Sequence, residues 1–165
     1  MYLIFMRGFP MIMNIFLVLV YVFSHENFYL KTLLVLTASG LSNHILKEKV
    51  FKPLMGNKNF PIIGIGKRPH GAKNCGLICN NYLSKSYGMP SGHTQYASVL
   101  STILSLKLYY SNHNNNVKVL GLLGFILITC LVAHSRIMLK CHTLQQTILG
   151  GLIGIFIGYK SYKYT

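Results

Sequence analysis

Long apolar runs separated by shorter polar stretches form the dominant pattern of the chain. A helix that spans a bilayer needs about 20 mostly apolar residues, and each run comes close to that length once its flanking residues are counted. The pattern therefore predicts an all-α fold, an integral membrane bundle of about five transmembrane helices. The predicted helices cover Phe9–Phe23 with flanking residues, Phe28–Leu46, Ser91–Tyr110, Val117–Ala133 and Thr143–Tyr159.

Two polar connections interrupt this pattern. The loop 48–90 is basic, contains several prolines and closes at Pro90. At about 40 residues it is long for a plain connector, and such loops are usually functional. The second connection covers 134–142. Because two predicted helices lie between them, both connections emerge on the same membrane side. We expect one domain over residues 1–165, with its core at 28–160 and part of a site in the 48–90 loop.

The last predicted helix carries glycines at regular intervals. Gly150, Gly154 and Gly158 are spaced by four residues and therefore share one helix face. Small residues at this spacing let two helices approach closely in a membrane. We interpret this face as a packing surface without a catalytic role.

Composition supports a membrane protein and points to an anionic partner. Hydrophobic residues make up 52% of the 165 residues and charged residues only 11%, outside the usual range for soluble domains. The net charge is +14, from 16 Lys+Arg against 2 Asp+Glu. We expect phosphate or anionic lipid as the partner, and not nucleic acid, because the charges lie between apolar runs and form no continuous basic helix.

The scarcity of carboxylates excludes several classes of enzyme. Glu26 and Glu48 are the only acidic side chains. A Mg²⁺ or two-metal hydrolase needs several carboxylate ligands, and a paired-carboxylate glycosidase needs two at one bond. We therefore expect no metal and no cofactor, and chemistry that depends on His, Lys, Arg, Ser or Cys.

The cysteines leave alternatives open. Cys130 lies within an apolar run and is predicted to be a buried thiol. Cys75 and Cys79 could form a disulfide if the loop faces an oxidising compartment. Together with His70 they could also supply zinc ligands, although the spacing is loose and a fourth ligand is missing.

The stretch Pro90-Ser91-Gly92-His93 ends the long loop and opens an apolar helix. Pro90 stops the preceding structure, and Ser91 is a good N-cap. The backbone N–H groups that follow would form an anion site at the helix N-terminus. His93 would then stand beside a bound phosphate as a proton donor.

Two further segments supply what a phosphate needs. Arg68-Pro69 lies in the long loop, and Ser135-Arg136 precedes His142 in the second connection. Arginine forks match phosphate oxygens bidentately. A second imidazole could attack phosphorus as a neutral nucleophile, so these segments are typical of phosphoryl transfer without a metal.

Together these segments resemble the signature of the type 2 phosphatidic acid phosphatase / vanadium haloperoxidase superfamily. That signature reads Lys-x6-Arg-Pro, then Pro-Ser-Gly-His, then Ser-Arg-x5-His. The second motif is present without change, and the third runs from Ser135 to His142 with the right spacing. The resemblance covers roughly residues 43–158.

The resemblance implies a lipid phosphatase and a role for each motif residue. His142 would be the nucleophile that forms a phosphohistidine, and His93 would be the acid that later activates water. The phosphate would be bound by Lys47, Arg68, Ser91, Gly92 and Arg136. Supporting positions would be Pro69, Pro90, Ser135 and Gln146.

The chain departs from the family pattern at two places. Pro61 stands where the first motif expects lysine, so we assign that role to Lys47, at the end of the second predicted helix. Twenty residues then separate Lys47 from Arg68 where the pattern has six, so fourteen loop out, and Lys58 and Lys67 are the competing candidates. Gln146 replaces an Asp that many members use to orient the last histidine; it can accept a ring hydrogen bond but adds no charge.

The sequence around both histidines resembles the dolichyl-diphosphatase branch of the family, which implies removal of the terminal phosphate from a polyprenyl diphosphate. A phosphatidic acid-type substrate stays open. Alternatives are a vanadate-dependent haloperoxidase-like enzyme and a non-catalytic membrane protein that binds anionic lipid. We expect a multi-pass protein of the endoplasmic reticulum or of a viral or host membrane. The side that the site faces and the oligomeric state stay open.

Overall fold

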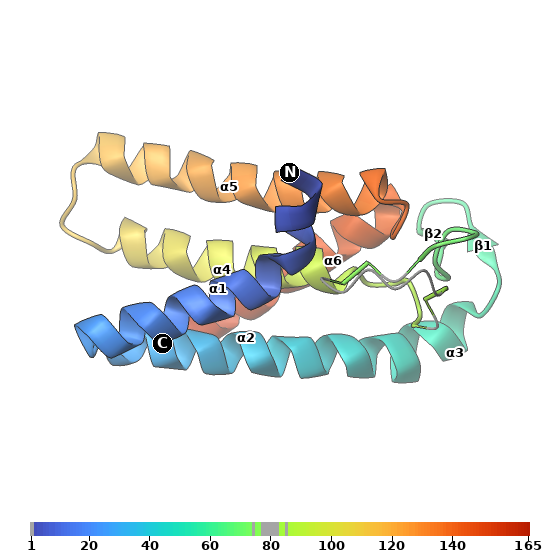
Figure 1. Ribbon diagram of the computed structural model, residues 1–165, viewed down its shortest axis with the longest axis horizontal. Coiled ribbons are helices and arrows are strands. Elements are labelled where there is room, and N and C mark those ends of the chain that lie inside the picture. Colours follow the sequence, from blue (N-terminus) through green and yellow to red (C-terminus); the bar gives the residue numbers. More distant parts are fainter. Residues whose placement is uncertain (1, 74, 77–82, 85) are drawn as a thin grey trace.

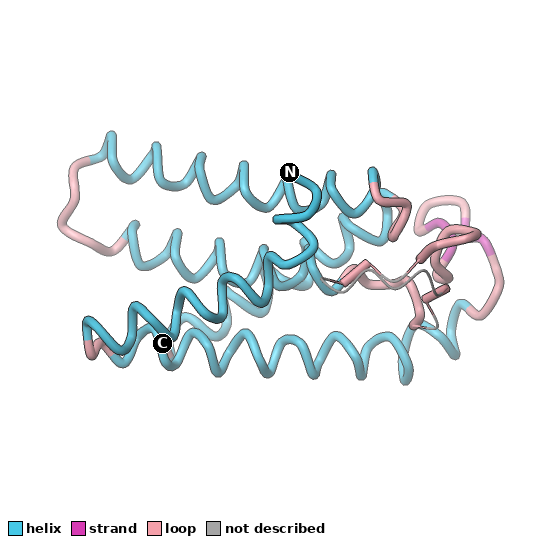
Figure 2. Tube along the Cα trace, in the orientation of Figure 1, coloured by secondary structure: helices cyan, strands magenta, loops and turns pink. Residues whose placement is uncertain are grey.

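Five long helices lie side by side in the computed structural model, within the part of the chain that it describes, residues 2–73, 75–76, 83–84 and 86–165 (Figures 1 and 2). The loop that carries the small strands lies at one end of this bundle. The long helices are α1 (Tyr2–Ser24), α2 (Asn27–Ile45), α4 (Gly92–Tyr109), α5 (Asn115–Met138) and α6 (Leu144–Ser161).

Short elements follow α2 where the sequence predicted the start of a loop. A π-helical turn, η1 (Leu46–Phe51), and the short helix α3 (Lys52–Met55) continue α2, so the predicted start of the loop at residue 48 is wrong. The strands β1 (Asn59–Phe60) and β2 (Gly64–Ile65) form an antiparallel pair. The chain ends in a 3-10 turn, η2 (Tyr162–Tyr164).

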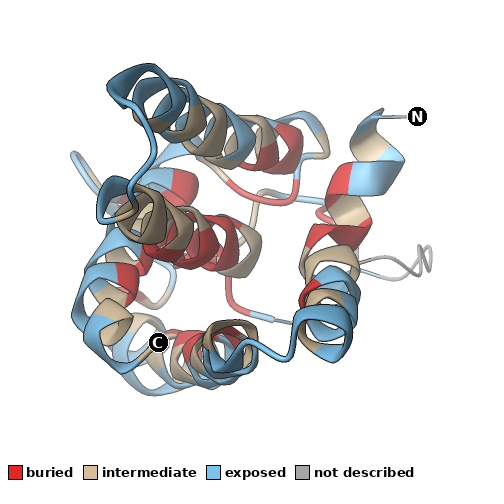
Figure 3. Ribbon diagram, turned by 90° about the vertical axis from the view of Figure 1, so that its left-hand side faces the viewer, coloured by how far each residue is buried: buried red, intermediate tan, exposed pale blue. Residues whose placement is uncertain are grey.

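Helix α4 lies at the centre of the bundle. It packs against α1, α2, α5 and α6, and its residues Thr94–Leu100 are all buried. In Figure 3 the buried segments gather on this helix and on the inward sides of its neighbours, while the outer sides are exposed. The Pro90-Ser91-Gly92-His93 motif at the start of α4 is therefore held by contacts on several sides.

The glycine face of α6 packs on α4, which confirms the prediction of close helix contact. A Cβ atom at Gly150 would lie 2.5 Å from the carbonyl oxygen of Ser91. A Cβ at Gly154 would overlap the carbonyl oxygen of Gln95, and one at Gly158 would lie 2.9 Å from that of Val99. The helices can approach this closely only because these positions lack side chains.

Two predicted boundaries are wrong. Helix α1 begins at Tyr2 and runs through Pro10, with its first turns bent away from the rest (Figure 1). Proline has no N–H for the carbonyl four residues earlier and kinks a helix there. Helix α5 continues to Met138, so the predicted connection starting at residue 134 is mostly helical. Ser135 and Arg136 can lie in this buried helical turn because their side chains form hydrogen bonds within the protein instead of with water.

Two of the described helices are long and apolar enough to cross a membrane. They are α1, with a mean hydropathy of 2.1, and α5, with 2.2. Large apolar side chains also cover the outer surface of the bundle: Phe23 is 83% exposed, Leu120 69% and Phe156 62%. Such a surface suits a hydrocarbon environment better than water.

Candidate active site

The start of α4 presents Ser91, Gly92 and His93 beside the start of α6. Ser91 is fully buried, and its N–H donates to the carbonyl of Gln146 over 3.0 Å. Ser91 is the N-cap by position, but its Oγ lies 3.1 Å from Oγ1 of Thr94 and makes no side-chain cap bond, contrary to our prediction. The first N–H groups of α4 still lack intrahelical partners, as at any helix start.

His93 is held by the backbone of α1. Its Nε2 lies 3.1 Å from the carbonyl oxygen of Arg7. A carbonyl only accepts hydrogen bonds, so Nε2 carries the proton in this contact and Nδ1 is the nitrogen left for proton transfer. This contact, between residues 86 positions apart, was not predicted from the sequence.

His142 is oriented by Gln146. The imidazole is 4% exposed, and its Nδ1 lies 3.0 Å from Oε1 of Gln146. The amide Nε2 of Gln146 donates to the carbonyls of Ile65 (2.8 Å) and Lys67 (2.7 Å), which fixes Oε1 as the atom that faces the ring. Nδ1 of His142 therefore donates, and Nε2 keeps a free lone pair, as a nucleophile requires.

The surroundings of His142 favour its neutral form. Burial lowers the pKa of His142 well below its usual range, and the positive charges of Arg68 and Lys47 lower it further. The hydrogen bond that His142 donates to Gln146 opposes this shift, and the nearby His93 lowers the pKa slightly more. Four predicted site residues therefore act on one another within one electrostatic cluster: Lys47, Arg68, His93 and His142.

Lys47 lies in the π-helical turn after α2 and is 8% exposed. Burial, together with the charge of Arg68, lowers its pKa to about 8, and Glu48 opposes the shift. The competing lysines, Lys58 and Lys67, are exposed. This placement supports Lys47 as the lysine of the first motif, because it alone of the three is buried within the cluster.

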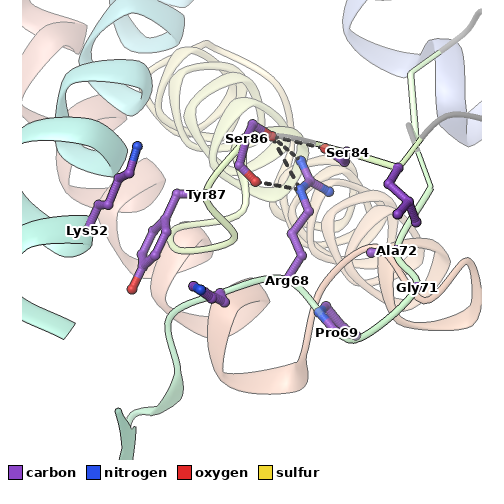
Figure 4. A pocket seen from close by; sticks show the side chains of 10 residues that line it. Lys52, Arg68, Pro69, Gly71, Ala72, Ser84, Ser86 and Tyr87 are labelled. Atoms are coloured by element: carbon purple, nitrogen blue, oxygen red, sulfur yellow. Dashed lines mark hydrogen bonds between the residues drawn. The ribbon is translucent and has the colours of Figure 1, made fainter. Parts of the chain in front are cut away.

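Arg68 is fixed by the loop and by the segment before His142. Its Nε donates to the carbonyl of Ser86 (3.1 Å), its Nη2 to Oγ of Ser86 (2.8 Å), and its Nη1 to the carbonyl of Cys141 (3.1 Å). Burial lowers the pKa of Arg68. In Figure 4 its guanidinium points toward Ser86 in a cavity of about 310 Å³, with Lys52 and Tyr87 on one side. Pro69 lies on the same wall.

Arg136 is fully buried near the end of α5. Its Nη2 donates to the carbonyl of Met6 (2.8 Å), its Nη1 to the carbonyl of Cys75 (3.1 Å) and its Nε to Oγ of Ser135 (3.1 Å). Ser135 in turn donates to the carbonyl of Val132. The structure thus gives Ser135 a supporting contact to Arg136. The Met6 carbonyl is free to accept because Pro10, four residues later, has no N–H.

A disulfide between Cys75 and Cys141 joins the loop to the segment before His142. The alternative pairing of Cys75 with Cys79 and the use of Cys75 as a zinc ligand are therefore wrong, while Cys79 itself lies outside the described residues. Cys130, predicted to be buried, is an exposed free thiol on α5. Within the described residues, no group of three or more His, Cys, Asp or Glu side chains could hold a metal ion.

Another cavity, of about 240 Å³, is lined in part by His93. Its lining comes from α1 (Pro10), α2 (Asn43) and α4 (Gly92, His93 and Tyr96). The side-chain amide of Asn43 donates to Oε1 of Gln95 over 2.8 Å. The contribution of α1 and α2 to this cavity was not predicted, and its signal in the sequence is the break that Arg7, Gly8 and Pro10 make in the first apolar run.

Comparison with known proteins finds a matching family and several curated relatives. A family model described as the PAP2 superfamily matches residues 28–165. The chain is 38% identical over 76 residues to dolichyldiphosphatase 1 of Homo sapiens, covering 41% of this chain and 32% of that protein. It is 33% identical over 102 residues to dolichyldiphosphatase of Saccharomyces cerevisiae, covering 61% and 43%.

A third relative is dolichyldiphosphatase 1 of Dictyostelium discoideum, at 33% identity over 78 residues, which covers 46% of this chain and 34% of that protein. The chain thus spans less than half the length of these curated relatives. No solved structure matches it significantly.

Proposed function

This chain belongs to the PAP2 superfamily, and from that premise we propose that it is a membrane phosphatase. Its substrate would be a lipid phosphomonoester or a lipid diphosphate. The relatives named dolichyldiphosphatase favour a polyprenyl diphosphate, from which the terminal phosphate would be removed. The phosphate would pass through a covalent intermediate on His142, without a metal.

The orientation of His142 is the observation that carries the proposal. Gln146 holds Nδ1, so Nε2 keeps its lone pair and can attack phosphorus. The bond from phosphorus to the leaving oxygen breaks as the new P–N bond forms. His93 would enter this step as the imidazolium, with its Nε2–H held by the carbonyl of Arg7, and its Nδ1 proton would pass to that oxygen and leave the ring neutral. His93 then takes a proton from water, which attacks the phosphohistidine and releases inorganic phosphate.

Positive charge would stabilise the transferred phosphoryl group. Lys47, Arg68 and Arg136 supply the cations, and the N–H groups from Gly92 onward supply hydrogen bonds at the start of α4. Phosphoryl transfer depends mostly on positioning and on electrostatic stabilisation, which this set provides. The contacts of Arg68 and Arg136 with backbone carbonyls hold the guanidinium groups in place before substrate arrives.

The five long helices would each cross the membrane, which would make the protein multi-pass. The positive-inside rule places the basic loop in the cytoplasm. However, disulfides persist in oxidising compartments, and Cys75 and Cys141 both lie at the site. We therefore favour a site that faces away from the cytosol, in the endoplasmic reticulum or in a viral or host membrane.

The test is hydrolysis of a panel of lipid mono- and diphosphates by the purified protein in EDTA. We expect phosphate release, greatest with polyprenyl diphosphates, and a loss of at least about a thousandfold in His142→Ala. In sealed vesicles the activity should stay latent until detergent opens them, if the site faces the lumen. Turnover that is unchanged in His142→Ala contradicts the mechanism. A folded protein with no turnover on any lipid phosphate would favour the non-catalytic, lipid-binding alternative.

A further inference from the structure

Arg7 is a cation in α1 for which the protein supplies no counter-charge. Its Nε is buried and has no hydrogen-bond partner among the described residues. The only two acidic side chains are engaged elsewhere: Glu26 lies 2.9 Å from Nζ of Lys107, and Glu48 lies 2.6 Å from Nζ of Lys52. No carboxylate side chain is therefore left to compensate the guanidinium.

The residue stands directly beside the proposed site. The carbonyl oxygen of Arg7 holds Nε2 of His93 at 3.1 Å, and the carbonyl of Met6, one residue earlier, accepts from Nη2 of Arg136 at 2.8 Å. The first turns of α1 therefore contact both His93 and Arg136 through the backbone of Met6 and Arg7.

A buried N–H without an acceptor is unfavourable, and Nε of Arg7 is such a group. A doubly negative phosphoryl group beside Arg7 would supply the missing acceptor through a charge-assisted hydrogen bond. The bend at Pro10 is what brings the first turns of α1 to this place.

We propose that Arg7 binds the phosphoryl group of the substrate from the α1 side, as a cation in addition to Lys47, Arg68 and Arg136. This inference rests on the proposed function and adds a residue that lies before the region matched by the family model, residues 28–165. Arg7 therefore belongs to a part of the chain that the family signature does not describe.

The test compares Arg7→Gln with Arg7→Lys and with Lys31→Gln, a control that removes one exposed positive charge on α2. Two readouts are needed: the affinity for inorganic phosphate, from the rise of the melting temperature with phosphate concentration, and KM and kcat for a lipid phosphate. In Arg7→Gln we expect phosphate affinity to fall about tenfold or more, KM to rise more than kcat falls, and the melting temperature without phosphate to rise. Arg7→Lys should be intermediate, and Lys31→Gln should match the natural protein.

The two proposals fail in different ways. Wild-type phosphate affinity and KM in a folded Arg7→Gln protein would overturn the role of Arg7 and leave the phosphatase proposal intact. Arg7-dependent phosphate binding in a protein without turnover would support the anion site and overturn the catalytic proposal. If Arg7→Gln does not fold, the Arg7→Lys variant is the test. A phosphate affinity of Arg7→Lys equal to that of the Lys31→Gln control would overturn the proposal that the guanidinium of Arg7 binds phosphate.

Discussion

The chemistry of the site depends on how single side chains are held. Gln146 accepts from His142 through one amide atom and donates to the backbone of the loop that carries Arg68 through the other. An ionised aspartate at this position would place a negative charge beside the imidazole but could not donate hydrogen bonds to those carbonyls. Gln146, in place of Asp, therefore polarises the imidazole less but forms hydrogen bonds that connect α6 to the loop. The sequence predicts the ring contact, because it is local, but not the distant loop contact.

Lys47 should give the reaction an alkaline limit. Its pKa of about 8 lies below the ordinary lysine value of 10.5, so the side chain is charged below about pH 8 and neutral above it. A substrate phosphate keeps a constant charge above about pH 7, because its second pKa is about 6. We therefore expect KM to rise above about pH 8, measured from about pH 7 to 9.5, and Lys47→Met to show a KM about tenfold higher at pH 7. A KM that stays constant through pH 9.5 in the natural protein would refute this role.

The same shift has a consequence for stability. Between about pH 8 and 10.5 the unfolded chain binds more protons at Lys47 than the folded chain does. The contribution of this residue to folding stability therefore increases as pH rises through that window, because the folded state no longer buries a charge. Activity and stability should thus change in opposite directions above about pH 8.

Among the elements, the contact between α4 and α6 brings the two histidines together. His93 lies at the start of α4 and His142 just before α6, so the closeness of the two helices sets the distance between the rings. The glycine spacing is readable from the sequence, as are the apolar runs. Pro10 marks the bend of α1, but the contact of the Met6 carbonyl with Arg136 and the extension of α5 are not readable, because both depend on partners far along the chain.

A matched pair of substitutions on α6 tests this contact. Gly154→Ala places a methyl group against the carbonyl of Gln95, so α6 must move away from α4. We expect a loss of about 1–3 kcal/mol in the free energy of unfolding and reduced kcat. Gly151→Ala is the control, because its Cβ would lie 3.5 Å from Oγ of Ser98, an ordinary contact. Equal melting temperatures for the two variants would be inconsistent with tight packing at Gly154.

At the scale of the whole molecule, every long helix contributes to one end of the bundle. The site takes its groups from α1, the turn after α2, the loop, α4, the end of α5 and the start of α6. The Cys75–Cys141 disulfide fastens the loop to the segment before His142, and the carbonyls of both cysteines accept from site arginines. Cysteine spacing could not predict this pairing, because it joins residues 66 positions apart.

The most direct measurement is chemical capture of the covalent intermediate. Substrate labelled in its terminal phosphate is mixed with the protein, the reaction is stopped at alkaline pH, where phosphohistidine survives, and the labelled peptide is sequenced. We expect label on His142 and none in His142→Ala. In His93→Ala the label should persist longer, because His93 no longer activates water. Steady turnover with no label on His142, or with label on His93 instead, would contradict the proposed mechanism.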